Sequence, residues 1–402
     1  MTRFRIPSGT STRYATGRAR CDRPKAGSRH LWAAAAAVLV GGGGTVAAVV
    51  AAAAPGSASP GRPASRPMVD TPPPQPPLRV ALESPLAGAT GVDGSQPAVF
   101  STIGTVDLAG IRPTVSPPVP GRWSAAPGVL TWAPLGALPP LTHVSFSFPA
   151  GVATTGRSSL GQAVTLGFTT TAGSVLSLQQ SLAELGYLPL RFSPSTATPT
   201  GAGAARAVYH PAAGTFSWSW PDVPPALAAA WQPGKANVMT RGAVMAFEHD
   251  HGLAADGVAG PLVWSALLRA TSSGHPLANH HGYTFAVASK ALPETITVWH
   301  DGRMISQSRT NSGIAQAPTP DGTFAVYERL STQVMKGTNP DGTPYADPVA
   351  WVAYFNGGDA IHYIARAYYG SPQSLGCLEV PYTVGKAIWP YLRIGTLVAV
   401  IG

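Results

Sequence analysis

Cys377 and His362 are the two side chains of this sequence with the clearest potential for covalent chemistry. Cys377 follows Gly376, and fourteen residues separate it from His362. A cysteine attacks a carbonyl carbon as its thiolate, so it needs a base that accepts its proton. Backbone N–H groups must also face the developing oxyanion, and a glycine beside the nucleophile lets the main chain turn tightly toward a substrate. The arrangement predicts a thiol nucleophile with an imidazole base, although either residue alone is more simply interpreted as a buried packing residue.

The N-terminal region predicts export. Residues 1–30 hold eight basic residues and one acidic residue, and an uncharged apolar run of 24 residues follows at 31–54. A basic segment, an apolar segment and nearby small residues are typical of a signal peptide. The run is also long enough for an uncleaved membrane anchor, so both alternatives stay open. In either case the basic flank stays in the cytoplasm, and we expect the rest of the chain beyond the outer face of the membrane.

Cysteine usage adds to this expectation. The chain has two cysteines, and Cys21 lies before the apolar run. Export therefore leaves Cys377 without a partner cysteine in an oxidising compartment, where an unpaired thiol favours a functional interpretation.

The basic charge is concentrated in the leader. The formal net charge is +9, of which residues 1–30 contribute +7, so the remaining 372 residues carry only +2. Nucleic-acid-binding proteins carry their basic residues on a folded face. The distribution therefore argues against nucleic acid as a partner.

The next regions are predicted to be a linker and a spacer. Residues 55–77 contain nine prolines and indicate an extended linker. Over residues 78–172, short β-type runs alternate with Gly/Pro turns, and residues 143–148 alternate polar and apolar side chains. The regular spacing of these runs favours a small β-sandwich. The segment SPLAGATGVDGSQPAVF resembles immunoglobulin-like modules of cell-wall enzymes.

Residues 175–270 predict a small module of three helices. Apolar residues recur at helical spacing from Val175 to Leu185. A second helix is expected with Thr240 as its N-cap, and a third with Pro261 in its first turn. The phrases LQQSLAELGYLPL and TRGAVMAFEHDHGLAADGVAGP resemble the bacterial peptidoglycan-binding module. An insertion over residues 191–234 interrupts the resemblance and is expected to alter or cover the ligand groove.

His249, Asp250 and His251 form a second cluster of potentially functional residues. It lies at the predicted end of the second helix and lacks the spacing of a recognised metal-ligand set. We therefore interpret it as a solvated helix C-terminus.

The C-terminal region, residues 283–402, predicts a mainly-β domain with one helix between residues 382 and 392. Its strand patterns are separated by Asp-Gly and Gly-Gly turns. The expected strands are 283–289, 295–300, 304–309, 323–330, 349–355, 360–363 and 397–401.

This region resembles the L,D-transpeptidase catalytic domain. The family signature is a His followed at a short distance by Ser/Thr-His-Gly-Cys, and the matching segments occur here in the same order. They are TPDGTF at 319–324, FNGGDAIH at 355–362, SLGC at 374–377 and GTLV at 395–398. The predicted architecture is thus multidomain: a β-sandwich-like spacer, a three-helix peptidoglycan-binding module and a mainly-β catalytic domain.

The resemblance implies a role for each matched residue. Cys377 would attack the carbonyl of the third stem-peptide residue and expel the terminal D-alanine, while His362 accepts the thiol proton. Gly376 and Cys377 would supply oxyanion-hole N–H groups, and the backbone carbonyl of Tyr363 would orient the imidazole. The implied substrate-binding residues are Ser374, Phe355, Gly357 and Gly358. Peptidoglycan stem peptides and glycan are the implied partners, carbapenem-type inhibitors are expected to acylate the thiol, and no metal or organic cofactor is implied.

Two departures from the family pattern affect the choice of acceptor. Leu375 replaces the second His of the signature, and Glu379 replaces a residue that is often Asn or Arg. Tyr363, in place of a small residue, is expected to narrow the pocket. An L,D-carboxypeptidase on the same fold and a non-catalytic peptidoglycan-binding protein remain alternatives to the transpeptidase.

Overall fold

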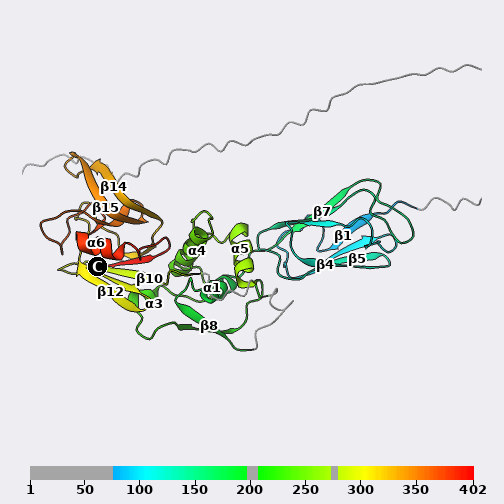
Figure 1. The fold of residues 1–402 in the computed structure, drawn as a ribbon, viewed down its shortest axis with the longest axis horizontal. Helices are drawn as coiled ribbons and strands as arrows, with labels where there is room; N and C mark the ends of the chain where they lie inside the picture. The colour runs from blue at the N-terminus through cyan, green and yellow to red at the C-terminus, as the bar shows by residue number, and fades with distance from the viewer. Residues whose placement is uncertain (1–75, 197–206, 273–278) are drawn as a thin grey trace, which may run out of the picture. The chain divides into compact units, whose positions relative to one another are not determined.

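The computed structural model describes residues 76–196, 207–272 and 279–402 (Figure 1). The predicted leader, the apolar run at 31–54 and nearly all of the proline-rich linker lie outside these residues. Within the described ranges, no helix combines the length and apolar character needed to cross a bilayer.

The first described region consists of two antiparallel sheets that share one hydrophobic core. The four-stranded sheet has the order β1 (Val80–Ser84), β2 (Ala98–Thr102), β5 (Val129–Pro134), β4 (Gly121–Ala126), and the three-stranded sheet has the order β3 (Thr114–Ser116), β6 (His143–Phe148), β7 (Val164–Thr169). Phe100 of one sheet meets Phe146 and Phe148 of the other edge-on, at ring-centroid distances of 5.1 and 5.2 Å. The alternating pattern of β6 thus places its aromatic side chains in the core. The immunoglobulin-like likeness stays a prediction.

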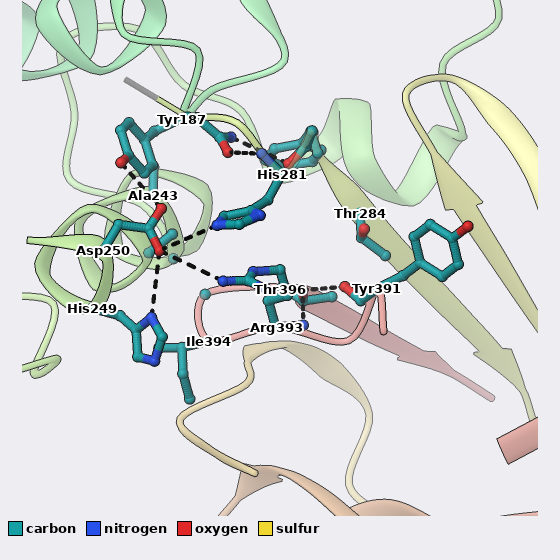
Figure 2. Close-up of a pocket in the computed structure, with 16 residues that line it drawn as sticks. Tyr187, Ala243, His249, Asp250, His281, Thr284, Tyr391, Arg393, Ile394 and Thr396 are labelled. Atoms are coloured by element: carbon teal, nitrogen blue, oxygen red, sulfur yellow. Dashed lines mark hydrogen bonds and ion pairs between the residues drawn. The ribbon is translucent and has the colours of Figure 1, made fainter. Parts of the chain in front are cut away.

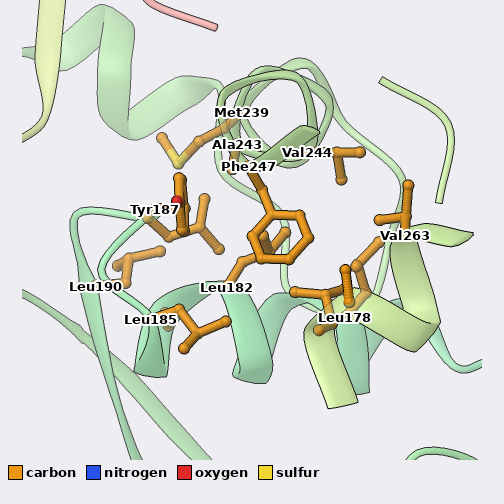
Figure 3. Packing of buried hydrophobic residues seen from close by; sticks show 14 of the residues in the cluster. Leu178, Leu182, Leu185, Tyr187, Leu190, Met239, Ala243, Val244, Phe247 and Val263 are labelled. Carbon is orange, nitrogen blue, oxygen red and sulfur yellow. The ribbon is translucent and has the colours of Figure 1, made fainter. Parts of the chain in front are cut away.

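Helices α1 (Val175–Glu184), α4 (Val238–Asp250) and α5 (Pro261–Ser272) pack around a second core (Figure 3). Tyr187 and Phe247 meet edge-on there, with ring centroids 5.4 Å apart. The sequence predicts Thr240 as the N-cap of α4, and this prediction is wrong. Asn237 caps the helix, because its side-chain oxygen accepts the N–H of Thr240 at 2.8 Å, so α4 begins earlier than expected.

The insertion forms structure of its own. Strands β8 (Leu190–Pro194) and β9 (Gly214–Trp218) pair as a two-stranded sheet, and the short helix α3 (Pro225–Ala229) follows. Gln179 of α1 contacts the C-terminal end of the insertion. Its side-chain amide donates to the Gln232 and Lys235 carbonyls at 3.0 and 3.1 Å. The effect of the insertion on ligand binding stays a prediction.

The C-terminal domain is mainly β and contains two sheets. The five-stranded sheet has the order β12 (Arg303–Arg309), β11 (Thr295–His300), β10 (Thr284–Ser289), β18 (Leu397–Ile401), β13 (Gly322–Ala325). The four-stranded sheet has the order β14 (Glu328–Thr338), β15 (Pro344–Asn356), β16 (Asp359–Tyr363), β17 (Leu378–Val380), and helix α6 (Tyr382–Ile388) follows β17.

The central strand β18 is apolar on both faces because each face contacts a different core. Val398 and Val400 lie in the core between the two sheets. Leu397 and Ala399 belong to the core of the helices. An unbroken apolar run is what a strand covered on both faces requires. The helical module therefore packs directly on the C-terminal domain through a continuous hydrophobic cluster.

Two glycines allow α4 and the chain before β18 to approach each other closely. Gly395 has a φ of +84°, and a Cβ atom there would lie 2.2 Å from the carbonyl oxygen of Gly242. A Cβ atom on Gly242 would lie 2.6 Å from the carbonyl oxygen of Gly395. Neither backbone can yield without separating the packed surfaces.

Replacing Gly395 with alanine is therefore expected to lower the free energy of unfolding by about 2–4 kcal/mol, from backbone strain and overpacking together. Gly342→Ala is the matched control, because Gly342 has a φ of +88° with no atom within 4 Å of its virtual Cβ. This control should lose only about 1–2 kcal/mol from strain. Urea unfolding measures both variants, and equal losses would contradict the close-packing explanation.

Candidate active site

The candidate nucleophile and base lie on neighbouring strands that pair in parallel. In the register of β16 and β17, His362 is the partner of Glu379. Cys377 directly precedes β17, two residues before Glu379. Side chains alternate between the two faces of a strand, and partners in register share a face. Cys377, Glu379 and His362 therefore point to the same side of the sheet.

The hydrophobic clusters agree with this assignment of faces. Ile361 and Leu378 lie in the core between the two sheets. Ala360 and Cys377 belong to a separate cluster on the outer face of the four-stranded sheet. The reactive pair thus faces away from the inter-sheet core.

The Cys377 thiol is covered by the long hairpin of β14 and β15. Its side chain is only 2% exposed, and its Sγ donates to the carbonyl oxygen of Gly358 at 3.8 Å. Met335, Val349 and Val352 of the hairpin belong to the same buried cluster. The hairpin therefore contributes to the burial of this side chain.

His362 is buried in the same region, with 3% of its surface exposed. Burial lowers the pKa of this imidazole, and the nearby Glu379 carboxylate partly opposes the effect. The backbone of Tyr363 opposes the effect of burial as well. Among the described residues, Nδ1 of His362 has no hydrogen-bond partner. A lowered pKa keeps the imidazole neutral near pH 7, which is the form that accepts a thiol proton.

The turn that leads to the thiol is fixed by internal hydrogen bonds. The Ser374 hydroxyl donates to the Cys377 carbonyl at 2.6 Å and accepts the Gly376 N–H at 3.2 Å. Gly376 has a φ of +122°, and a Cβ atom there would lie 2.3 Å from a carboxylate oxygen of Asp359. Only glycine fits this position. An oxyanion could use the Gly376 N–H only in competition with Ser374, so the expected role of this N–H stays a prediction.

The other expected site residues lie in three different surroundings. Gly357 and Gly358 form the turn between β15 and β16, and the Gly358 carbonyl contacts the thiol. The Tyr363 ring packs edge-on against Tyr382 of α6, with centroids 5.1 Å apart. Phe355 is 3% exposed and lies in the inter-sheet core. Its side chain is therefore directed away from the thiol.

An ion pair between the buried Glu379 and the more exposed Arg366 is the feature beside the base that sequence reasoning missed. Nε and Nη2 of Arg366 donate to the two carboxylate oxygens of Glu379 at 2.8 and 2.5 Å. The Asn311 amide donates to the same carboxylate at 3.1 Å. Glu379 therefore does not present an uncompensated charge to a substrate. No local pattern marks Arg366 or Asn311, since the pairing depends on segments far apart in the sequence.

A second group of polar side chains lines a pocket between α4 and the C-terminal domain, and Cys377 is not among the residues that line it (Figure 2). The Asp250 carboxylate accepts the Tyr187 hydroxyl at 3.1 Å and approaches Nη2 of Arg393 at 3.8 Å and Nδ1 of His249 at 3.4 Å. His251 instead stacks on Phe247, with ring centroids 3.9 Å apart. Asp250 thus joins the module to the C-terminal domain, and across the described ranges no cluster suits a metal ion.

The mainly-β fold of the C-terminal domain agrees with a family comparison. The C-terminal region, residues 284–400, matches the L,D-transpeptidase catalytic domain. The resemblance predicted from the sequence is thus confirmed for this domain. Residues 232–267 match a peptidoglycan binding domain, which covers α4 and most of α5 but not α1. No curated protein matches the chain.

Several solved L,D-transpeptidase structures are similar to the chain. An L,D-transpeptidase from Mycobacterium smegmatis is 15% identical, covering 81% of this chain and all of its own, with a TM-score of 0.28. The catalytic domain of the E. faecium L,D-transpeptidase, acylated by ertapenem, is 29% identical, covering 31% of this chain and all of its own, with a TM-score of 0.27. L,D-transpeptidase 3 from Mycobacterium tuberculosis, with a faropenem-derived adduct, is 14% identical, covering 80% of this chain and 98% of its own, with a TM-score of 0.28. Because these TM-scores are low, the family matches alone carry the assignment.

Proposed function

We propose that this chain is an exported L,D-transpeptidase that cross-links peptidoglycan through a thioester on Cys377. The observation that carries the proposal is the placement of Cys377 and His362 on one face of two paired strands, within the L,D-transpeptidase catalytic domain. The adjoining peptidoglycan binding domain would hold the enzyme on its polymeric substrate.

The first half-reaction forms the acyl-enzyme. His362 accepts the thiol proton of Cys377, and the thiolate attacks the carbonyl carbon of the third stem residue. The C–N bond to the terminal D-alanine breaks, and His362 returns the proton to the leaving amine. The low exposure of both side chains would strengthen the electrostatic interactions around this step.

The second half-reaction transfers the acyl group. An amine on a neighbouring stem attacks the thioester carbonyl and gives its proton to His362, and the thiolate leaves and regains that proton. The product is a cross-link between third residues. Water in place of the amine would give the L,D-carboxypeptidase alternative. Leu375 favours neither outcome, because its side chain can donate no hydrogen bond to either acceptor.

The N-terminal segments support an extracytoplasmic location. The basic leader and apolar run at residues 31–54 lie outside the described residues, so cleavage and anchoring remain the two alternatives. A function on peptidoglycan requires that the catalytic domain be exported by one of these routes.

Incubation of the protein with a purified disaccharide-tetrapeptide, read by mass spectrometry, tests the proposal. The expected product is a dimer that has lost one D-alanine, and Cys377→Ala should not form it. Tripeptide without dimer would replace the transpeptidase by the carboxypeptidase. Unchanged substrate, together with a thiol that a carbapenem does not modify, would leave a non-catalytic peptidoglycan-binding protein.

A further inference from the structure

The Arg366–Glu379 pair occupies an unusual position for an ion pair. The Glu379 side chain is 3% exposed and the Arg366 side chain 32%. An ionised carboxylate at this depth is stable only when its oxygens are hydrogen-bonded. Both oxygens are bonded to Arg366, and one also to Asn311. The same carboxylate is the register partner of the candidate base, His362.

Asn311 connects this pair to the segment that carries the thiol. Its backbone exchanges two hydrogen bonds with the backbone of Glu379, at 2.9 and 3.0 Å. Its side-chain oxygen accepts the Gly370 N–H at 2.9 Å and the Gln373 amide at 3.1 Å. The residues between β16 and Cys377 are therefore tied to the same centre as the strand that follows Cys377.

Charged side chains around His362 act on its protonated form with different strengths and signs. Glu379 on β17 contributes most, and Asp347 on β15 contributes less in the same direction, whereas Arg366 acts against both. When the imidazole accepts the thiol proton it becomes a buried cation. A buried cation needs a nearby anion to offset its desolvation.

We propose that Glu379, held by Arg366 and Asn311, is a positioning residue that holds the segment carrying Cys377 beside His362 and stabilises the imidazolium formed during acylation. The proposal rests on the proposed function only in assigning acylation to Cys377. The feature belongs to this chain's own residues, since Glu379 departs from the family pattern.

Glu379→Gln is the direct test, because glutamine keeps the size and hydrogen-bonding ability of the side chain and removes its charge. The rate of carbapenem acylation of the full-length protein is measured against pH. The plateau rate should fall about 10–100-fold, the range found for carboxylates that orient a metal-bound imidazole, and the acid limb should move to lower pH. Glu379→Asp, which retains the charge, should keep the acid limb close to that of the unmodified protein.

Asp347→Asn is the matched control, because it removes a carboxylate from the same neighbourhood that contributes less to His362. Its rate should change by less than about threefold. If Glu379→Gln fails to fold because Arg366 loses its partner, the double variant Arg366→Gln/Glu379→Gln replaces it. That variant should also show an acid limb at lower pH than the unmodified protein.

An acid limb that stays in place in Glu379→Gln, or in the double variant, would overturn the electrostatic role whatever the change in rate. Titration of the His362 ring by ¹⁵N NMR, assigned with His362→Gln, gives the same comparison without a substrate. If cross-linking fails but this titration moves to lower pH in Glu379→Gln, the proposed function is wrong and the inference stands. If cross-linking succeeds and the His362 titration stays in place in Glu379→Gln, the proposed function stands and the inference about Glu379 is wrong.

Discussion

Replacing Cys377 with alanine is expected to abolish the covalent mass increase that a carbapenem produces on this protein. The Cys377 sulfur lies on the same face as His362 and is buried beside the Gly358 carbonyl. A nucleophile cannot be replaced by a neighbouring group, so acylation should slow by more than about a thousandfold. Intact-protein mass spectrometry measures the loss.

The matched control uses the second thiol of the chain. Cys21→Ala should retain the full adduct, because Cys21 belongs to the predicted leader. Thermal unfolding of Cys377→Ala should show a folded catalytic domain. An adduct that persists in a folded Cys377→Ala protein would remove the assignment of the nucleophile.

Replacing His362 is expected to have the next largest effect, a fall of about 10²–10⁴-fold in the acylation rate at pH 7. Burial lowers the pKa of His362, so the neutral base persists below the ordinary histidine value of about 6.5. In the unmodified protein the rate should therefore fall only as the pH drops below about 6.5. The deficit of His362→Ala should narrow at alkaline pH, because hydroxide then removes the thiol proton without the imidazole.

His362→Gln accompanies the alanine variant, because it fills more of the buried space and still cannot act as a base. His143→Ala on β6 is the control, since His143 lies in the first β region. A rate profile with its acid limb above pH 6.5, the ordinary histidine value, would contradict the account of the base. So would a His362→Gln protein with an unchanged rate.

The sequence predicted the family of the C-terminal domain because the resemblance lies in short segments. Cys377 with its preceding glycine and His362 stand within matched motifs, and both lie within the confirmed domain. The strand at Leu397–Ile401 was also predictable, since an unbroken apolar run favours a buried strand. What the run could not reveal is that its two faces contact different cores.

Features that depend on register were not predictable. Phe355 was expected near the substrate, but its position in β15 places the ring in the inter-sheet core. A one-residue difference decides the face of a strand residue, and residue type alone does not fix it. The Arg366–Glu379 pair likewise depends on the parallel pairing of β16 with β17 and on a loop that brings the arginine back to the sheet.

The N-cap of α4 was likewise not predictable from the local sequence. Thr240 and Asn237 are both good capping residues, and the sequence favoured the wrong one. The Thr240 hydroxyl instead accepts the buried amide of Gln179 at 2.9 Å. Tertiary contact with α1 therefore decides how Thr240 is used.

The most direct test of the central claim is to trap the acyl-enzyme. The protein is mixed with disaccharide-tetrapeptide, quenched in acid after a short time, digested and mapped by mass spectrometry. The account predicts a thioester on the peptide that contains Cys377, with the mass of the donor less its terminal D-alanine. A released D-alanine with the acyl group on another residue, or product formation without any acylated Cys377, would contradict it.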